Sequence, residues 1–463
     1  MVIPLITAPY LSEILGAYGI GKVNYATAVI GWFILAASFG VPRFAYREIA
    51  KFRDDRKKTS SIFWNMIFIQ FILVIIFLSI YTVFIFNISQ FREALPLYLI
   101  MGLLLIFNVF ETNWLYKGLE EYGYIAVRNI AVKCLSTFMI FFLVSHPQHY
   151  LMLAAINVLM VGINNLINYK QAFKHIDKQK GVLKPFYYIK KMKVFFYMAV
   201  LIALYTRLNQ IFLGSVSIAD LAFFVRSISI LGIGTSLTIA VAASISSRAA
   251  YLVHSNREDY KVMSQKSINY IYLLGIPISV TLFFFAREAM YILGGEEFAQ
   301  GSLGLQIMAP LSLIITLGSW VSSQLLIPNG LEKNAFRIQC AAVILSIVLN
   351  FFLVSSFSYI GAALTWLIVE TFLFVAKAFY ARLKCQDIMI NYLTSSTMRF
   401  LTAASLMVVI FIGVKGTVEN EIVMILSAGI LGGGIYILTL IILREKTIIQ
   451  VFNNIKIIKN LPL

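Results

Sequence analysis

The chain has 463 residues, of which 60% are hydrophobic and only 13% are charged, and its mean hydropathy is +0.84. Soluble domains are about 45–50% apolar and about 25% charged, so this composition excludes a water-soluble globular protein. The net charge of +17 does not indicate a nucleic-acid partner, because the basic residues lie in short loops between apolar runs. We therefore predict an all-α polytopic integral membrane protein.

Apolar runs long enough to cross a bilayer recur along the whole chain, since one span needs about 20 mostly apolar residues. We expect about fourteen transmembrane helices, near residues 1–15, 24–42, 61–86, 94–116, 125–145, 150–169, 194–213, 219–245, 268–286, 304–327, 336–355, 360–381, 400–415 and 422–443. The first run is too short to cross a bilayer alone, so we expect the true start of the protein to lie upstream of Met1.

The basic residues distinguish the two sides of the membrane. With the loop at 43–60 in the cytoplasm and alternating spans, the opposite loops hold only Lys22, Arg92, Arg287 and Lys415. Positive charge gathers on the cytoplasmic side of membrane proteins, so we predict a cytoplasmic C-terminus. Basic inner loops of this kind also contact anionic membrane lipids.

A weak internal repeat indicates how the spans are grouped. "ILGAYGIGKVNYATAVI" and "FLGSVSIADLAFFVRSISI" align with Gly16 on Gly214 and Ile20 on Ile218. Paired repeats are common in secondary transporters, whose substrate site lies at the repeat interface. We predict two facing six-helix lobes and two further helices. The boundaries are 1–169 for the N-terminal lobe, 170–193 for a basic cytoplasmic linker, 194–381 for the C-terminal lobe, and 382–463 for the last two helices and the cytoplasmic tail.

Arginines within the spans are candidate binding residues, because a charge at the centre of a membrane helix costs about 2.5–3.5 kcal/mol. Arg207 and Arg226 lie at similar depth on the seventh and eighth spans. A guanidinium group offers a planar set of donors that suits phosphate. We predict a water-filled cationic cavity that binds an anionic headgroup. The alternative interpretation is an intramembrane ion pair with Asp220 or Glu370.

Four further ionisable residues within the spans have less specific interpretations. Arg128 and Lys377 lie close to the inner boundary, so their long side chains are expected to snorkel to the interface. Lys133 and Glu111 lie at similar depth on neighbouring spans. Lys133 is a candidate substrate-binding residue, and Glu111, Glu370 and Asp220 are candidate coupling or structural acids. A structural salt bridge between Lys133 and Glu111 is the alternative.

Enzymatic motifs are not found in the sequence. There is no Walker A motif, and the three cysteines have no metal or disulfide spacing. His146 and His149 alone do not form a zinc site. We therefore expect no cofactor, no metal and no enzymatic activity. A polytopic polysaccharide polymerase is the alternative of a different class, but the longest outer loop, at about 287–303, is small for catalysis. A channel is a third possibility, but the sequence shows no signature of a selectivity filter.

Several segments resemble Wzx-type polysaccharide flippases, which belong to the oligosaccharidyl-lipid and polysaccharide branch of the MOP exporter superfamily. They include "IPLITAPYLSEILGAYGIGKVNYA", "SFGVPRFAYREIAKFRDD", "ETNWLYKGLEEYGYIAVRNIAVK", "YTRLNQIFLG", "LGGEEF", "APLSLIITLGSWVSSQLLIPNGLEKNAF" and "YIGAALTWLIVE". The segments occur in the same order and span nearly the whole chain. The chain departs from the family where Asn209 replaces a frequent Asp and Glu13 replaces a frequent Arg.

The resemblance implies a flippase of the bacterial inner membrane that translocates undecaprenyl-diphosphate-linked oligosaccharide units for O-antigen, lipopolysaccharide or capsule synthesis. It implies alternating access around a cationic cavity. A polysaccharide polymerase and a chain-length regulator are the implied protein partners. Asn209 leaves carboxylate-dependent ion coupling at its position open. The alternatives within the superfamily are a flippase for lipid II, the peptidoglycan precursor, and a MATE-like antiporter. The basic excess argues against cation transport.

Overall fold

The computed structural model describes residues 2–177, 183–385, 388 and 390–451, and no β-strand occurs among them. In the first half of the chain the helices are α1 (Val2–Ser38), α2 (Val41–Lys51), α3 (Arg56–Asn87), α4 (Ser89–Arg92), α5 (Leu95–Asn108), α6 (Asn113–Gly118), α7 (Tyr122–Leu143), η1 (Pro147–His149), α8 (Tyr150–Ala172) and α9 (Pro185–Val216). In the second half they are α10 (Ile218–Ser255), α11 (Arg257–Phe284), α12 (Ala286–Ala299), α13 (Ser302–Met308), α14 (Leu311–Trp320), η2 (Val321–Leu326), α15 (Glu332–Leu349), η3 (Asn350–Val354), α16 (Ser355–Lys384), α17 (Ser395–Thr417) and α18 (Glu421–Ile442).

The chain is a multi-pass membrane protein. Among the described residues, ten helices are long and apolar enough to cross a membrane, or eleven if the bent α9 is counted as one span. Each of the fourteen expected spans overlaps a helix, but neighbouring spans merge. The first two join in α1 across a kink at Gly16 (φ 64°), and two later ones join across Ser358 (φ 47°). The expected number of fourteen stays a prediction.

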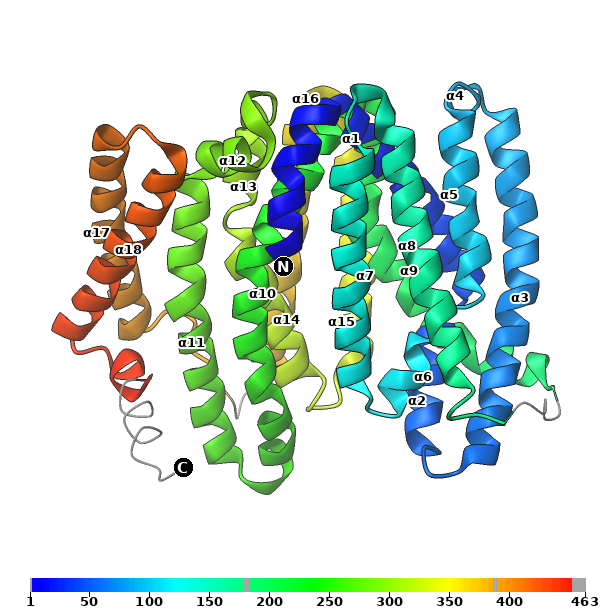
Figure 1. The fold of residues 1–463 in the computed structure, drawn as a ribbon. Helices are drawn as coiled ribbons and strands as arrows, with labels where there is room; N and C mark the ends of the chain where they lie inside the picture. Colours follow the sequence, from blue (N-terminus) through cyan, green and yellow to red (C-terminus); the bar gives the residue numbers. More distant parts are fainter. Residues whose placement is uncertain (1, 178–182, 386–387, 389, 452–463) are drawn as a thin grey trace. The chain divides into compact units, whose positions relative to one another are not determined.

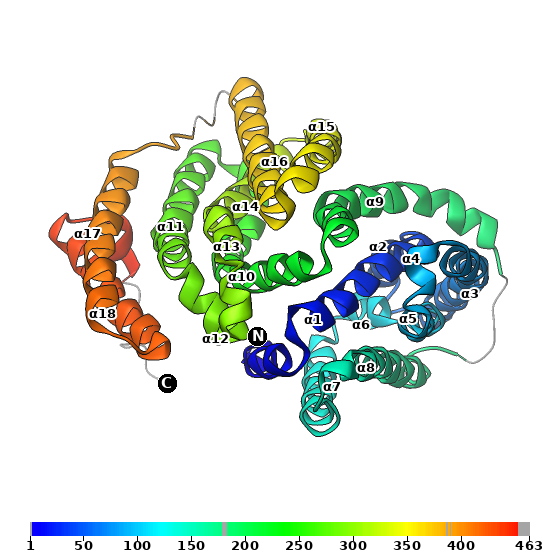
Figure 2. The same cartoon turned by 90° about the horizontal axis from the view of Figure 1, so that it is seen from above.

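The chain divides into two compact units, Met1–Ala222 and Phe223–Leu463. In the first unit α1 lies between α9 on one side and α7 and α8 on the other (Figure 2). In the second unit α16 packs against α13, α14 and α15, and the α17–α18 hairpin packs on α11 through α17 (Figure 1). Helix α9 contacts α1, α2 and α3 of the first unit. The predicted lobes and their boundaries stay a prediction.

The packing of α1 on α9 joins the two segments of the weak sequence repeat. Gly214 lies against the ring of Tyr25, and a Cβ atom at Gly21 would overlap the carbonyl group of Ile218. Both glycines therefore permit a close approach of backbones that a larger residue would prevent.

Helix α2 forms where the sequence suggests only a basic loop, at 43–60. Val41, Phe44, Ala45 and Ile49 share its buried face and belong to a core cluster of the first unit. The helix follows Gly40, whose left-handed φ of 78° favours glycine. Its apolar face packs beside α6 (Figure 1), so the arginines and lysines of the segment occupy the other faces of a short amphipathic helix.

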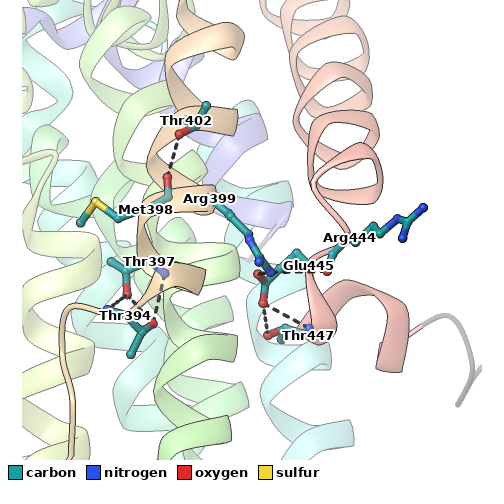
Figure 3. Close-up of polar contacts among 8 residues, drawn as sticks. All are labelled: Thr394, Thr397, Met398, Arg399, Thr402, Arg444, Glu445 and Thr447. Atoms are coloured by element: carbon teal, nitrogen blue, oxygen red, sulfur yellow. Dashed lines mark hydrogen bonds and ion pairs between the residues drawn. The ribbon is translucent and has the colours of Figure 1, made fainter.

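A polar network fastens the end of α18 to the start of α17 (Figure 3). Arg444 has a left-handed φ of 51°, and the Glu445 carboxylate that follows is fully buried. Arg399 donates to Glu445 Oε2 at 3.0 Å, and the backbone N and Oγ1 of Thr447 donate to Oε1. Burial alone would raise the pKa of Glu445, but hydrogen bonds from Ser396, Arg399 and Thr447 outweigh it and hold the pKa below the ordinary value of 4.5.

This network predicts a pH-dependent end of the chain. Because the pKa of Glu445 is lower in the folded state, its carboxylate stabilises the fold at pH values above 4.5, and the contribution is lost as the pH falls through the lowered pKa. Glu445→Gln should therefore speed amide hydrogen exchange over residues 445–449 at neutral pH and have little effect once the pH lies below the lowered pKa of Glu445. Glu419→Gln, at an exposed carboxylate, is the control. Equal exchange in both variants at neutral pH would contradict the prediction.

Candidate functional site

Arg207 lines a cavity of about 340 Å³ in the first unit. The cavity lies among α1, the start of α2 and α9, and Arg43 of α2 is its second cationic residue. Its remaining lining is mostly small or apolar, including Gly31, Ile34 and Ala203. The volume falls within the range of about 300–1,000 Å³ typical of small-molecule sites.

Local packing fixes the position of both arginines. The guanidinium group of Arg207 lies directly against Gly31, where a Cβ atom would overlap Nη1. Arg43 is the third residue of α2, directly after Pro42 at the helix N-terminus. Because Gly40 lies close to the backbone of Phe195 and Phe196 on α9, the start of α2 is held beside the helix that carries Arg207.

The electrostatics of this cavity favour an anion. Both arginines are exposed, and the described ion pairs join neither guanidinium group to a carboxylate. Two like charges beside one cavity repel each other unless water or an anion lies between them. The cavity can therefore bind an anionic group through two planar sets of donors. We call it the arginine cavity.

Sequence reasoning singled out Arg207 as a candidate but assigned Arg43 only to a topology-setting loop. Their position beside one cavity depends on packing between residues more than 160 positions apart, and no local pattern reports that. One signal was present in the sequence, the segment Gly-Val-Pro-Arg at 40–43. Its proline indicates the start of a helix there, because proline is favoured in the first turn.

Lys133 lines a different cavity of the first unit, of about 440 Å³, together with Asn129, Ser136, Asn157 and Asn164. The side chain of Lys133 is exposed. Among the described residues, no ion pair joins Lys133 to Glu111, and the alternative of a structural salt bridge between them stays a prediction.

Glu111 belongs to a half-buried hydrogen-bond network at the break between α5 and α6. Its Oε1 accepts from Asn113 Nδ2 at 2.8 Å, and Asn113 Oδ1 accepts from Arg128 Nη2 at 2.8 Å and from Asn168 Nδ2 at 3.0 Å. Arg128 is only 6% exposed and lies over the ring of Tyr124. The expected snorkelling of Arg128 is therefore wrong, because Asn113 and Tyr124 bind its side chain within the helices.

In the second unit Arg226 is half-buried, and its guanidinium carbon lies 5.0 Å from the ring centre of Phe298. Glu370 is buried on α16 and accepts a hydrogen bond from Trp366 Nε1 at 3.3 Å. Lys377, two turns further along the same helix, is only 8% exposed. The expected snorkelling of Lys377 is wrong as well, because its side chain is enclosed by neighbouring helices.

Asp220 is half-buried in the first turn of α10, where its backbone N donates to Ser217 Oγ at 3.2 Å. Arg207 belongs to one unit and Arg226 to the other, so their shared cavity stays a prediction. Within the described part of the chain, no group of three His, Cys, Asp or Glu residues could hold a metal ion.

Comparisons with known proteins agree on one class. A family model described as "Polysaccharide biosynthesis protein" matches residues 1–251. Two proteins named "Putative O-antigen transporter" are each 24% identical to the chain. The one from Escherichia coli (strain K12) aligns over 80% of this chain and 90% of its own length. The one from Shigella dysenteriae aligns over 81% and 95%. Both names describe transporters and not enzymes.

Solved structures show the same fold at low sequence identity. The lipid II flippase MurJ in an inward closed conformation matches with a TM-score of 0.76 and 13% identity, over 96% of this chain and 97% of its own. A MOP superfamily transporter from Pyrococcus furiosus matches with a TM-score of 0.56 and 13% identity, over 83% and 94%. The fold is therefore that of the MOP superfamily.

Proposed function

The chain belongs to the polysaccharide biosynthesis protein family, and from this premise we propose that it is a Wzx-type flippase of the MOP superfamily that translocates undecaprenyl-diphosphate-linked oligosaccharide units. The two O-antigen transporter relatives and the fold support this proposal. The bilayer is the bacterial inner membrane, the C-terminus is cytoplasmic, and the units serve O-antigen, lipopolysaccharide or capsule synthesis. The names of the two relatives support the O-antigen transport.

The arginine cavity is the observation that carries this proposal. A diphosphate carries its charge on several equivalent oxygens, and two guanidinium groups can bind them with parallel hydrogen bonds. Arg43 and Arg207 line one cavity without a carboxylate partner among the described ion pairs. Their charge is therefore available to a ligand. A cation antiporter would need carboxylates at this position.

Other charged residues have supporting roles in this proposal. Arg226 and Lys133 bind further parts of the substrate, and Glu111, Glu370 and Asp220 act as coupling or structural acids. The burial of Glu370 and the hydrogen-bond network of Glu111 support a structural role for these two acids. Transport proceeds by alternating access. A polysaccharide polymerase and a chain-length regulator are the proposed protein partners.

A reconstitution experiment tests the function. Proteoliposomes are prepared with a fluorescent undecaprenyl-diphosphate-linked oligosaccharide in both leaflets, and a membrane-impermeant quencher is added outside. We expect the quencher to reach only the outer-leaflet label in protein-free vesicles and the inner-leaflet label as well in vesicles with the protein. Fluorescent lipid II is the parallel substrate. Faster translocation of lipid II than of the oligosaccharide carrier would favour the alternative function, and no translocation of either would overturn the proposal.

A further inference from the structure

The cavity that contains Lys133 is rich in side-chain amides. It lies among α1, α5, α7 and α8 of the first unit and has a volume of about 440 Å³. Its polar lining consists of Thr27, Asn129, Lys133, Ser136, Asn157 and Asn164. No carboxylate is among its lining residues. We call it the amide cavity.

Helix α7 presents a polar face to this cavity. Asn129, Lys133 and Ser136 follow one another at spacings of four and three residues, which places them on one face. Val127 and Phe138 on other faces are 70% and 65% exposed, as expected of side chains in contact with lipid. Polar side chains within a membrane helix face the protein interior or water. The polar face of α7 therefore faces a water-filled or ligand-filled space.

Helix α8 contributes two further amides, Asn157 and Asn164, two helical turns apart. The Oδ1 atom of Asn164 is buried and accepts no hydrogen bond within the described structure. A buried acceptor left without a donor costs about 1–3 kcal/mol. Asn164 therefore lines the cavity and carries a buried acceptor that no protein donor satisfies.

Helix α1 contributes lining residues to both the amide cavity and the arginine cavity. Thr27 lines the first, and Gly31, Ile34 and Ser38 line the second. These four residues recur at spacings of four, three and four, so they share one face of the helix. Thr27 and Gly31 are separated by about 6 Å along the axis. The α1 residues that line the two cavities are therefore close neighbours along one face of the helix.

We propose that the amide cavity is a carbohydrate subsite that binds the sugar residue next to the diphosphate. This inference rests on the proposed function. A sugar hydroxyl group both donates and accepts, and an asparagine amide offers two donors and an acceptor in a fixed plane. Met101, Leu104 and Met160 provide an apolar wall for the C–H face of the ring. Lys133 supplies a cation that favours a sugar with a carboxylate over a neutral one.

The test measures the affinity of the purified protein in nanodiscs for three probes. They are undecaprenyl diphosphate, the same carrier with one neutral hexose, and the same carrier with one hexuronic acid. We expect the wild type to bind the hexose carrier more tightly than the bare carrier. Asn157→Leu and Asn164→Leu should remove this advantage, which we expect to be about fivefold to tenfold. Lys133→Met should remove only the advantage of the acid over the hexose.

Controls separate this inference from the proposed function. Asn87→Leu, at an exposed residue of α3 that lines neither cavity, should leave all three affinities unchanged. Ser136→Ala is the conservative variant if a leucine variant does not fold. Wild-type protein that binds the bare and sugar-bearing carriers equally would overturn the subsite alone. Protein that binds none of the three would overturn the proposed function. An effect of the variants on the bare carrier would assign the amide cavity to the diphosphate and also overturn the subsite.

Discussion

Replacing Arg43 and Arg207 together by glutamine should abolish translocation and reduce the affinity for undecaprenyl diphosphate more than either single change. Each charge-assisted hydrogen bond contributes about 1.5–3 kcal/mol, so each single variant should lose about 10- to 100-fold in Kd. Glutamine keeps a donor of similar length but removes the charge. The measurement is carrier binding in nanodiscs, followed by the quenching assay on the same protein.

Three variants sharpen this prediction. Arg92→Gln removes an exposed arginine that donates only to the carbonyl of Phe86, and it should bind the carrier like the wild type. Gly31→Ala keeps both arginines but places a methyl group where the guanidinium group of Arg207 lies. It should weaken binding, whereas Gly123→Ala, with open space at its Cβ position, should not. Wild-type affinity in the double glutamine variant would rule out a diphosphate site in the arginine cavity.

Asn113→Leu should lower the stability of the protein more than any other single amide replacement proposed here. Asn113 hydrogen-bonds to Glu111, Arg128 and Asn168. Nε and Nη1 of Arg128 already have no hydrogen-bond partner in the described structure. Leucine would remove the amide that Glu111 and Arg128 share and leave Arg128 with Asn129 as its remaining hydrogen-bond partner, and each lost hydrogen bond costs about 1–3 kcal/mol. The melting temperature in detergent measures the effect.

We expect the loss of stability to come from the hydrogen bonds that Glu111 and Arg128 lose, and not from the change in packing. Adding Glu111→Gln and Arg128→Met to Asn113→Leu should therefore recover much of the stability, because replacing a whole buried network by neutral groups is often tolerated. Asn87→Leu is the matched control for the amide. If Asn113→Leu melts at the same temperature as Asn87→Leu, the network does not stabilise the fold.

Hydropathy predicted where the helices lie, because a chain in a bilayer has few alternatives to helices. It did not reveal which helices would merge, since the kinks at Gly16 and Ser358 are left-handed backbone positions without a hydropathy signal. Depth along a helix also failed as a guide to burial. Arg128 and Lys377 are close enough to the boundary to snorkel, yet neighbouring helices enclose both.

Arg43 illustrates the same limit at the candidate site. Its sequence context is a run of positive charge, and in such a run no single arginine stands out. Only the packing of Gly40 on α9 brings one of them beside Arg207. Arg207 itself was predictable because an arginine within an apolar span is rare and costly.

The proposed separation of the diphosphate site from the sugar subsite has an evolutionary consequence. Arg43 and Arg207 come from α2 and α9, whereas all three amides of the other cavity come from α7 and α8, which follow one another in the sequence. A single recombination event over residues 122–172 could therefore exchange sugar preference and leave the anchor for the carrier intact. Such a transplant would have to retain Arg128 and Asn168, because both bind Asn113 outside the exchanged segment.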